Sequence, residues 1–254
     1  MKRKFLCILS MFFVCLPAVV PAFAASAGAE GERQVLQCER GAIFADKAYG
    51  TAVLSAVRES DVFYRDIRIS LCEKGEKKAE IVPSADGGYN PHIELVSFDG
   101  ETEQIFYGAD SGGSGGYGYY FVYRASAGGT EELFSSETFE IPYTARYING
   151  FKAEVTNTRN GTVSLIDLSD RDADYLSQIY REDGTLIEPR ACDVGGVNSA
   201  APFYNNAQGR YGLEIYARIT GLYGADSLGY IVMRTAYENG GFTSFFDMTA
   251  VYAG

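Results

Sequence analysis

The stretch Gly108–Arg124, GADSGGSGGYGYYFVYR, returns 110 positions later in a related form, Arg218–Arg234, RITGLYGADSLGYIVMR. In both stretches a glycine-containing segment precedes a run of aromatic and β-branched residues, which is typical of a turn followed by a strand. The ungapped offset aligns Tyr120 with Tyr230, Val122 with Val232, and Arg124 with Arg234. The sequence therefore predicts two related β units.

The composition of the whole chain agrees with a β fold. Its 254 residues include 19 Tyr, 16 Phe and 29 Gly, and 46% of all residues are hydrophobic. Aromatic residues favour strands and glycines favour tight turns, so many short strands are expected. We predict an all-β or mostly β protein.

The N-terminus has the pattern of a secretory signal peptide. Lys2, Arg3 and Lys4 precede an apolar run from Phe5 to Leu16, and Ala22-Phe23-Ala24 has the small-x-small form of a cleavage site. The apolar run is shorter than the ~20 residues that a membrane-spanning helix needs. We predict a signal peptide over residues 1–24, a flexible lead-in over 25–33 and a single β-rich repeat domain over 34–254. The product would be secreted, either extracellular or periplasmic, without a membrane span.

Charge and cysteine content narrow the possible partners. The formal net charge of −11 disfavours nucleic acid and bare anionic membrane as partners, because phosphate groups repel an acidic protein. Cys7 and Cys15 lie in the predicted signal peptide, so three cysteines would remain after cleavage. Cys38 with Cys72 is the preferred disulfide, and three buried free thiols are the alternative.

Local patterns place several elements. Ile67, Ile69 and Leu71 alternate with polar residues, which predicts a strand and a hairpin that returns near Ile81. Asn149-Gly150 and Asn160-Gly161 predict two further hairpin turns. Gly88–Pro91 is expected to be a turn in which Pro91 forces Asn90 into extended geometry. A helix is expected to begin with Ser169 or Asp170 as its N-cap and to end before Gly184.

Four segments carry a resemblance to a known family. They are GGYNP (87–91), SGGSGGYGYYFVY (111–123), DLSDRDADYLSQIYREDGTL (167–186) and ITGLYGADSLGY (219–230). In these segments the chain resembles secreted bacterial proteins described as FG-GAP or VCBS-repeat-like. The resemblance implies a β-propeller of about five blades at roughly 40 to 50 residues each, with the helix as an insertion. An open β-meander with two similar units is the structural alternative.

Proteins of that family carry acidic calcium loops, from which this chain departs. Asp99, Glu101 and Glu103 stand where such a loop would lie, and carboxylate oxygens are suitable Ca²⁺ ligands. We expect either a calcium site at these three residues or solvated turn acids. No other cofactor is expected.

Two aspartates are candidates for acid–base chemistry. Asp110 and Asp226 each occur in the tetrapeptide GADS, and a pair of carboxylates could act on a glycosidic bond. Capping of an Asx-turn by each side chain explains both residues without catalysis.

The repeat also provides candidate binding residues. Arg124 and Arg234 could grip an acidic glycan or a peptide carboxylate, with Tyr120 and Tyr230 beside them on the aligned strands. Cross-strand pairing of both arginines with nearby acids is the structural alternative.

The function expected from these observations is binding without catalysis. No coherent catalytic constellation is present in the sequence, whereas export and repeated β units favour a protein that recognises an envelope component, either a glycan or a protein. The alternatives are a secreted hydrolase that uses Asp110 or Asp226, and a purely structural envelope protein.

Overall fold

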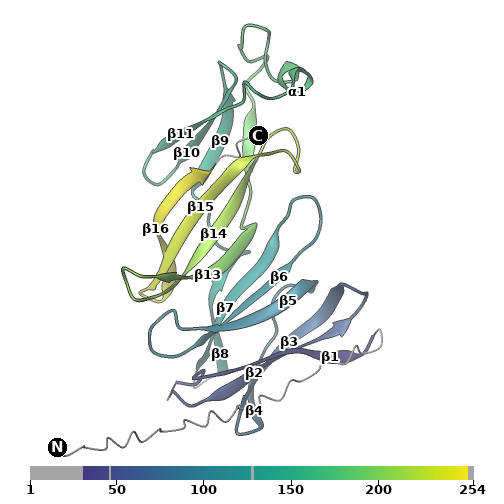
Figure 1. Cartoon of the computed structure of the whole chain (residues 1–254), viewed down its shortest axis with the longest axis vertical. Coiled ribbons are helices and arrows are strands. Elements are labelled where there is room, and N and C mark those ends of the chain that lie inside the picture. The colour runs from purple at the N-terminus through teal and green to yellow at the C-terminus, as the bar shows by residue number, and fades with distance from the viewer. Residues whose placement is uncertain (1–30, 46, 127–128, 251–254) are drawn as a thin grey trace, which may run out of the picture.

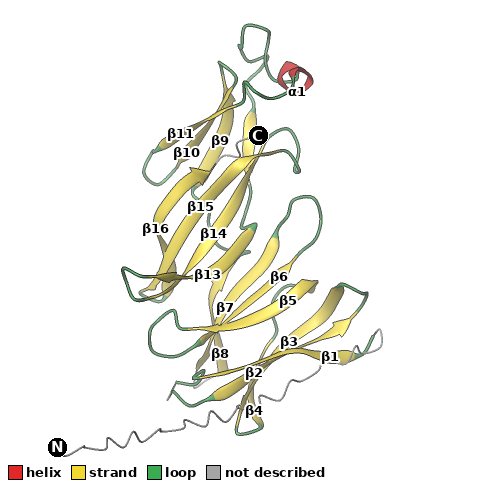
Figure 2. Cartoon of the chain, viewed as in Figure 1, coloured by secondary structure: helices red, strands yellow, loops and turns green. Residues whose placement is uncertain are grey.

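The computed structural model describes residues 31–45, 47–126 and 129–250, and within them the protein is all-β (Figures 1 and 2). Sixteen strands form two antiparallel sheets of eight strands each, and α1 (Ala173–Ser177) is the single helix of the described residues. The predicted signal peptide lies outside these residues. The predicted propeller is wrong, because the strands continue into two large sheets instead of ending in blades of about four.

The first sheet contains the N-terminal strands in the order β1-β2-β3-β5-β6-β7-β8, with β4 paired to β3. The strands are β1 (Arg33–Gly41), β2 (Gly50–Arg58), β3 (Phe63–Glu73), β4 (Glu76–Ile81), β5 (Gly87–Val96), β6 (Gln104–Asp110), β7 (Gly118–Ser126) and β8 (Gly129–Ser135). The predicted strand at Ile67–Leu71 and its hairpin partner at Ile81 are confirmed as β3 and β4.

The first sheet curls so that β1 approaches β5. The side-chain amide of Gln37 on β1 donates to the carbonyl of Ile93 on β5 at 2.8 Å and accepts from its N–H at 2.9 Å. The side-chain amide of Gln37 thus bonds both backbone polar groups of Ile93, as a neighbouring strand would. Alternate residues of the curled strands, such as Leu54, Ile69 and Tyr107, face inward and form one hydrophobic core.

The second sheet has the order β11-β10-β9-β12-β14-β15-β16, with β13 paired to β14. The strands are β9 (Tyr143–Ile148), β10 (Lys152–Asn157), β11 (Val163–Asp167), β12 (Ala191–Val194), β13 (Ser199–Asn205), β14 (Arg210–Thr220), β15 (Ser227–Glu238) and β16 (Gly241–Ala250). The hairpins predicted at Asn149-Gly150 and Asn160-Gly161 are confirmed as the β9–β10 and β10–β11 turns.

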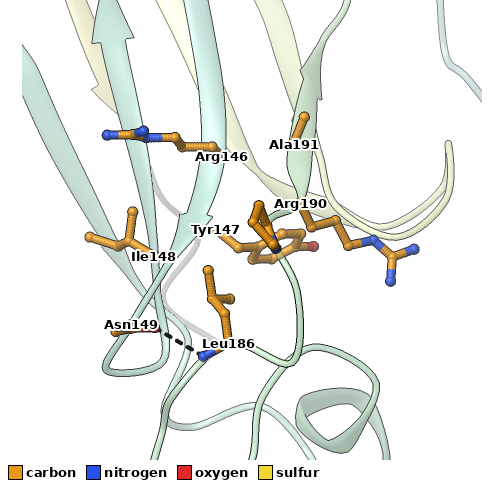
Figure 3. A pocket seen from close by; sticks show the side chains of 8 residues that line it. Arg146, Tyr147, Ile148, Asn149, Leu186, Arg190 and Ala191 are labelled. Atoms are coloured by element: carbon orange, nitrogen blue, oxygen red, sulfur yellow. Dashed lines mark hydrogen bonds between the residues drawn. The ribbon is translucent and has the colours of Figure 1, made fainter.

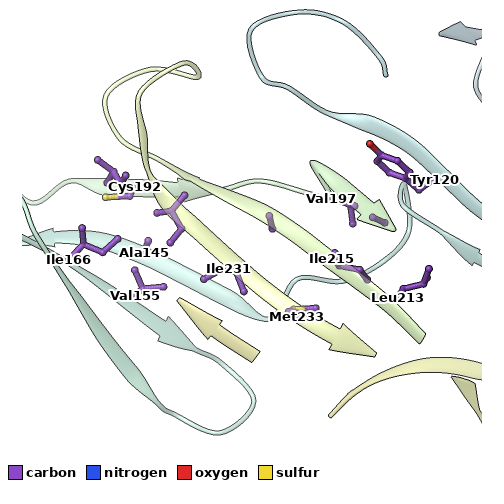
Figure 4. Packing of buried hydrophobic residues seen from close by; sticks show 14 of the residues in the cluster. Tyr120, Ala145, Val155, Ile166, Cys192, Val197, Leu213, Ile215, Ile231 and Met233 are labelled. Carbon is purple, nitrogen blue, oxygen red and sulfur yellow. The ribbon is translucent and has the colours of Figure 1, made fainter. Parts of the chain in front are cut away.

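The strands β6 and β7 are buried on both faces. Tyr107 and Phe121 point into the core of the first sheet, whereas Phe106, Tyr120 and Val122 belong to a second core built mainly by the second sheet (Figure 4). Alternation along a strand sends successive side chains to opposite faces. The β6–β7 hairpin is therefore shared by both cores and joins the two halves of the chain.

The two repeated stretches form equivalent hairpins. Phe106 pairs with Val122 in β6–β7, and Tyr216 pairs with Val232 in β14–β15, which is the same register after the offset of 110. The aligned residues thus occupy matching positions on matching strands. The predicted relationship between the two β units is confirmed at the level of these hairpins.

The glycine-rich segment of the first repeat packs against the second sheet. Asn198 donates from its amide to the carbonyls of Gly115 and Gly116 at 2.8 and 3.0 Å, and Arg218 donates to the carbonyl of Ser114 at 3.2 Å. A Cβ at Gly116 would lie 2.7 Å from the Arg218 guanidinium, and its φ is +63°. The left-handed backbone at Gly116 favours glycine.

Two local predictions are corrected by the structure. Asn90 is part of β5 and not of a turn, and its φ of +50° is left-handed instead of extended. Its side chain donates to Asp110 at 3.0 Å, and the irregular pairing between Tyr89 and His92 marks a bulge that holds this backbone. The helix is shorter than predicted, because Asp172 is its N-cap and Gln178 its C-cap. Gly184 lies in a later turn, in which the Arg181 N–H donates to the Thr185 carbonyl.

No helix of the described residues is long and apolar enough to cross a membrane.

Candidate binding face of the second sheet

On the face away from its core, the second sheet carries aromatic and charged side chains. Directly paired residues of an antiparallel sheet share a face. Three rows result, Arg218–Tyr230, Tyr216–Val232–Met248 and Glu214–Arg234–Phe246, and Phe203 on β13 lies beside them. We call these nine residues the aromatic face.

Arg234 occupies the centre of the exposed part of this face. Its Nε donates to Glu214 Oε2 at 2.6 Å, and its guanidinium carbon lies 5.3 Å from the ring centre of Phe203 and 5.9 Å from that of Phe246. These distances are within the range of cation–π attraction. The Arg234 side chain is 48% exposed, and Phe246 and Met248 are 43% and 47% exposed.

Glu214 fixes the position of its neighbours. Its Oε1 accepts from the Tyr216 hydroxyl at 2.7 Å, and the Tyr216 ring lies edge-on to Tyr230, with ring centres 6.3 Å apart. Partial burial raises the pKa of Glu214, but the hydrogen bonds from Tyr216 and Arg234 outweigh it, so the net pKa lies below its usual value. The same hydrogen bond, followed by burial, raises the pKa of Tyr216. Glu214 is thus held as a carboxylate between two donors.

Tyr120 and Arg124 do not join this face, although the repeat aligns them with Tyr230 and Arg234. Both lie at the junction of the two sheets. Arg124 donates from Nη2 to Asp99 Oδ2 at 3.1 Å and to the Tyr237 hydroxyl at 3.0 Å, and Tyr120 is 7% exposed. The structure therefore separates the four predicted binding residues into one pair at the junction of the sheets, Tyr120 and Arg124, and one pair on the aromatic face, Tyr230 and Arg234.

Asp226 lies in a buried polar cluster. Its Oδ2 accepts from the Tyr175 hydroxyl and from the Leu222 N–H, both at 2.8 Å, and Arg171 lies 3.6 Å from Oδ1. Tyr175 in turn shares a hydrogen bond of 2.9 Å with Tyr147. Burial and these acidic partners raise the pKa of Tyr175 far above its usual value. The Asp226 side chain is 2% exposed, so it has little access to a substrate.

Asp110 lies elsewhere, at the exposed end of β6, where it accepts from Asn90. His92, the one histidine of the chain, contacts the carbonyl of Asn90 through Nδ1 at 3.1 Å. Asp110 and Asp226 thus occupy different environments. No contact among the described residues brings their two carboxylates together.

The residues proposed for calcium make internal contacts. Asp99 Oδ1 accepts from the N–H groups of Glu101 and Thr102, and its Oδ2 accepts from Gln104 and Arg124. Glu103 accepts from the Ala42 N–H at 2.6 Å. Within the described part of the chain no group of three or more His, Cys, Asp or Glu side chains is placed to hold a metal ion.

The three cysteines of residues 31–250 are free thiols. Cys38 is on β1 and Cys72 on β3, and β2 lies between them because it pairs with both strands. The preferred disulfide is not formed in this arrangement. Cys192 is buried in the second core, and burial raises its pKa to about 12.

A cavity of about 510 Å³ opens where β9 diverges from the segment before β12. Ile148 and Leu186 line it, and Asn149 Oδ1 accepts from the Leu186 N–H at 2.9 Å (Figure 3). The side chains of Arg146 and Arg190 extend in opposite directions from it. In a ligand-binding cavity, the polar groups that fix the ligand point toward it. The side chains of Arg146 and Arg190 do not converge in this way.

Sequence reasoning identified Tyr230 and Arg234 but missed Phe203, Glu214, Tyr216 and Phe246. A signal for β14 was present, since Glu214 and Tyr216 alternate with the apolar residues Leu213, Ile215 and Ala217. The Asn239-Gly240-Gly241 turn indicated that the last strand returns beside β15, but nothing in the sequence indicated that Phe203 of β13 lies beside Arg234.

Comparison with known proteins places this face in a matched region. Residues 141–250 match the family described as the YybI C-terminal domain. The chain is also 34% identical over 147 residues to the uncharacterised protein YybI of Bacillus subtilis (strain 168). That alignment covers 57% of this chain and 56% of the relative, so a little over half of the relative's length is matched. No solved structure matches the chain.

These findings overturn the resemblance to FG-GAP or VCBS-repeat proteins. The matched family is a different one, and its matched region begins just before β9 and ends with β16. The four segments that suggested the resemblance belong to different elements, namely part of β5, part of β7, α1 and the ends of the β14–β15 hairpin, together with the turns beside them.

Proposed function

We propose that this protein is a secreted binding protein, without catalytic activity, that recognises an envelope component through the aromatic face. The observation that carries the proposal is the placement of Arg234 between Phe203 and Phe246 on an open sheet surface. Arginine and aromatic residues are enriched where binding energy is concentrated. The N-terminal sequence predicts export. The proposal that the partner lies in the envelope depends on that prediction.

The surroundings of the candidate catalytic aspartates favour binding over hydrolysis. Asp226 is almost fully buried and has three hydrogen-bonding or charged partners. Asp110 is exposed and contacts an asparagine side chain, without a second carboxylate beside it among the described contacts. A glycosidase needs two carboxyl groups on either side of the scissile bond.

The test is retention of the mature chain, residues 25–254, on fractionated envelope material. We expect saturable retention without product release, and a loss of about tenfold or more in affinity for Arg234→Ala, which corresponds to ~1.4 kcal/mol. Arg65→Ala is the matched control, because Arg65 is an exposed arginine of the first sheet that is paired with Glu59.

Absence of saturable retention on every fraction would refute the proposal. Release of sugar or peptide products that Asp110→Asn or Asp226→Asn abolishes, while the fold is kept, would instead establish the hydrolase.

A further inference from the structure

The repeated hairpins differ in what covers their corresponding faces. In the first hairpin Phe106 and Val122 are 1% and 0% exposed, and they lie in the core shared with the second sheet. The corresponding residues of the second hairpin, Tyr216 and Val232, are on the aromatic face; Tyr216 is half-buried and Val232 is 9% exposed, but Phe246 beside them is 43% exposed. The surface is thus fully covered by protein in the first copy, whereas in the second it is open around Arg234 and Phe246.

The cover of the first copy has a defined chemistry. It includes the tip of the β15–β16 hairpin, where Tyr237 and Phe242 pair directly across the two strands. Phe242 packs edge-on against Phe98 and Phe134, with ring centres 5.2 and 5.6 Å apart. The Tyr237 hydroxyl accepts from Arg124, whose guanidinium carbon also lies 5.3 Å from the centre of the Tyr237 ring. An aromatic hairpin tip therefore satisfies both the apolar and the charged part of this face.

We propose that the aromatic face receives the aromatic tip of a β-hairpin of another protein. This inference rests on the proposed function and names its class of partner. Arg234 corresponds to Arg124, so a tyrosine hydroxyl or a carboxylate of the partner is expected to accept from its guanidinium. The rings of the partner would pack on Phe203, Phe246 and Met248.

The composition of the face favours a protein over a glycan. The face includes donors such as Arg234. The residues around that arginine, Phe203, Phe246 and Met248, however, offer apolar area without a hydrogen-bond donor, and sugar hydroxyls left unpaired on this area would be costly. A second copy of this chain is disfavoured as the donor of the tip, because its own tip is packed at the junction and Tyr237 is 8% exposed.

The probe for the test is a backbone-cyclised peptide with the sequence of Thr235–Ser244, TAYENGGFTS, which reproduces the internal tip. Titrated into the mature chain, it is expected to bind saturably and to shift the NMR signals of Tyr230 and Arg234. Binding should weaken about tenfold or more in Arg234→Ala and in Phe246→Ala. Arg65→Ala should leave it unchanged, and a peptide with alanine at both aromatic positions should not bind.

Three outcomes would overturn the inference. One is absence of saturation up to ~1 mM peptide, the weak limit of specific binding. The second is sedimentation of the chain as a dimer that Phe246→Asp makes monomeric, which would identify a second copy as the occupant. The third is retention on protease-treated envelope polysaccharide that Arg234→Ala abolishes; in that case the proposed function stands and the partner class is wrong. Failure of both envelope retention and peptide binding would remove the two proposals together.

Discussion

At the residue scale, the same residue type has opposite roles in different surroundings. Asp226 and Asp110 occur in the same tetrapeptide, but one is sealed among Tyr175, Leu222 and Arg171 and the other is exposed beside Asn90. Arg124 and Arg234 occupy the same repeat position, but one is at the sheet junction and the other on open surface. The role of each side chain is set by its neighbours in space.

Asp226→Ala is expected to destabilise the protein strongly. The change leaves the buried Tyr175 hydroxyl and the Leu222 N–H without their acceptor, which costs roughly 2–4 kcal/mol in the free energy of unfolding. Asp110→Ala, at an exposed position, should change it by less than about 0.5 kcal/mol. Urea unfolding followed by circular dichroism measures both, and equal effects would contradict the structural role of Asp226.

The carboxyl group of Glu214 is expected to titrate below the usual range of a glutamate. Because its folded-state pKa is lowered, the stability that it contributes is present above the unfolded pKa and is lost as the pH falls through the folded pKa. NMR titration of the side-chain carbon gives this pKa directly. In Tyr216→Phe it should rise, since one donor is lost; an unchanged pKa would show that this hydrogen bond is absent in solution.

The thiols are expected to differ in reactivity. Burial raises the pKa of Cys192 to about 12, so at pH 8 almost none of it is the reactive thiolate. The pKa of Cys38 is also raised, first by partial burial and then by Glu39 and Cys72, but the Cys38 side chain is exposed. Alkylation of the mature chain followed by mass spectrometry should modify Cys38 first and Cys192 only after unfolding; early modification of Cys192 would mean that the second core opens.

At the element scale, the β6–β7 hairpin holds the two halves together because both of its faces are buried. Its inward residues complete the first core and its other face completes the second. The preceding glycine-rich segment adds hydrogen bonds to Asn198 and Arg218. The β14–β15 hairpin has the same register, but its second face is only partly covered, since Val232 is 9% exposed while the Arg234 side chain is 48% exposed.

Matched substitutions in the two hairpins should therefore differ in cost. Phe106→Ala removes a fully buried ring and is expected to lower the free energy of unfolding by about 3–5 kcal/mol. Tyr216→Ala, at the equivalent position, removes a partly exposed ring and should cost roughly 1 kcal/mol. Chemical denaturation of both variants makes the comparison. If the two costs are similar, the faces are not covered differently in solution.

At the scale of the whole molecule, the shared core makes the two sheets interdependent. Phe106, Tyr120 and Val122 of the first sheet belong to the same cluster as Leu213, Ile215 and Met233 of the second. Figure 4 shows Tyr120 beside these residues of the second sheet. Separating the sheets would expose this apolar surface to water, at about 25 cal/mol for each Å².

A fragment that ends after β8, residues 31–135, is expected to be unstable alone. Its exposed β6–β7 face should bind the dye ANS or cause association, as exposed apolar patches do. The intact chain should unfold in a single transition by both circular dichroism and tyrosine fluorescence. A monomeric fragment with the stability of the intact chain, or two separate transitions, would show that the sheets are independent.

The sequence by itself determined the local features of this protein. Alternation at Ile67–Leu71 and the two Asn-Gly turns correctly predicted strands and hairpins, because side-chain period and positive φ act over a few residues. The offset of 110 correctly predicted two related β units, which the structure shows to be hairpins of the same register. The helix was placed correctly but made too long, because Asp172 and not Ser169 or Asp170 is its N-cap, and all three residues are acceptable caps by local preference. The left-handed Asn90 was missed, because its backbone is held in a bulge and its side chain donates to Asp110, 20 positions away.

The tertiary structure decided which faces of the two repeated hairpins are covered. Which face of each hairpin is covered depends on contacts between strands more than 100 positions apart, such as Arg124 with Tyr237, and these contacts leave no periodic signal in the sequence. A strand pattern fixes which side chains share a face, whereas only packing against the rest of the chain decides whether that face becomes core or remains open for a partner.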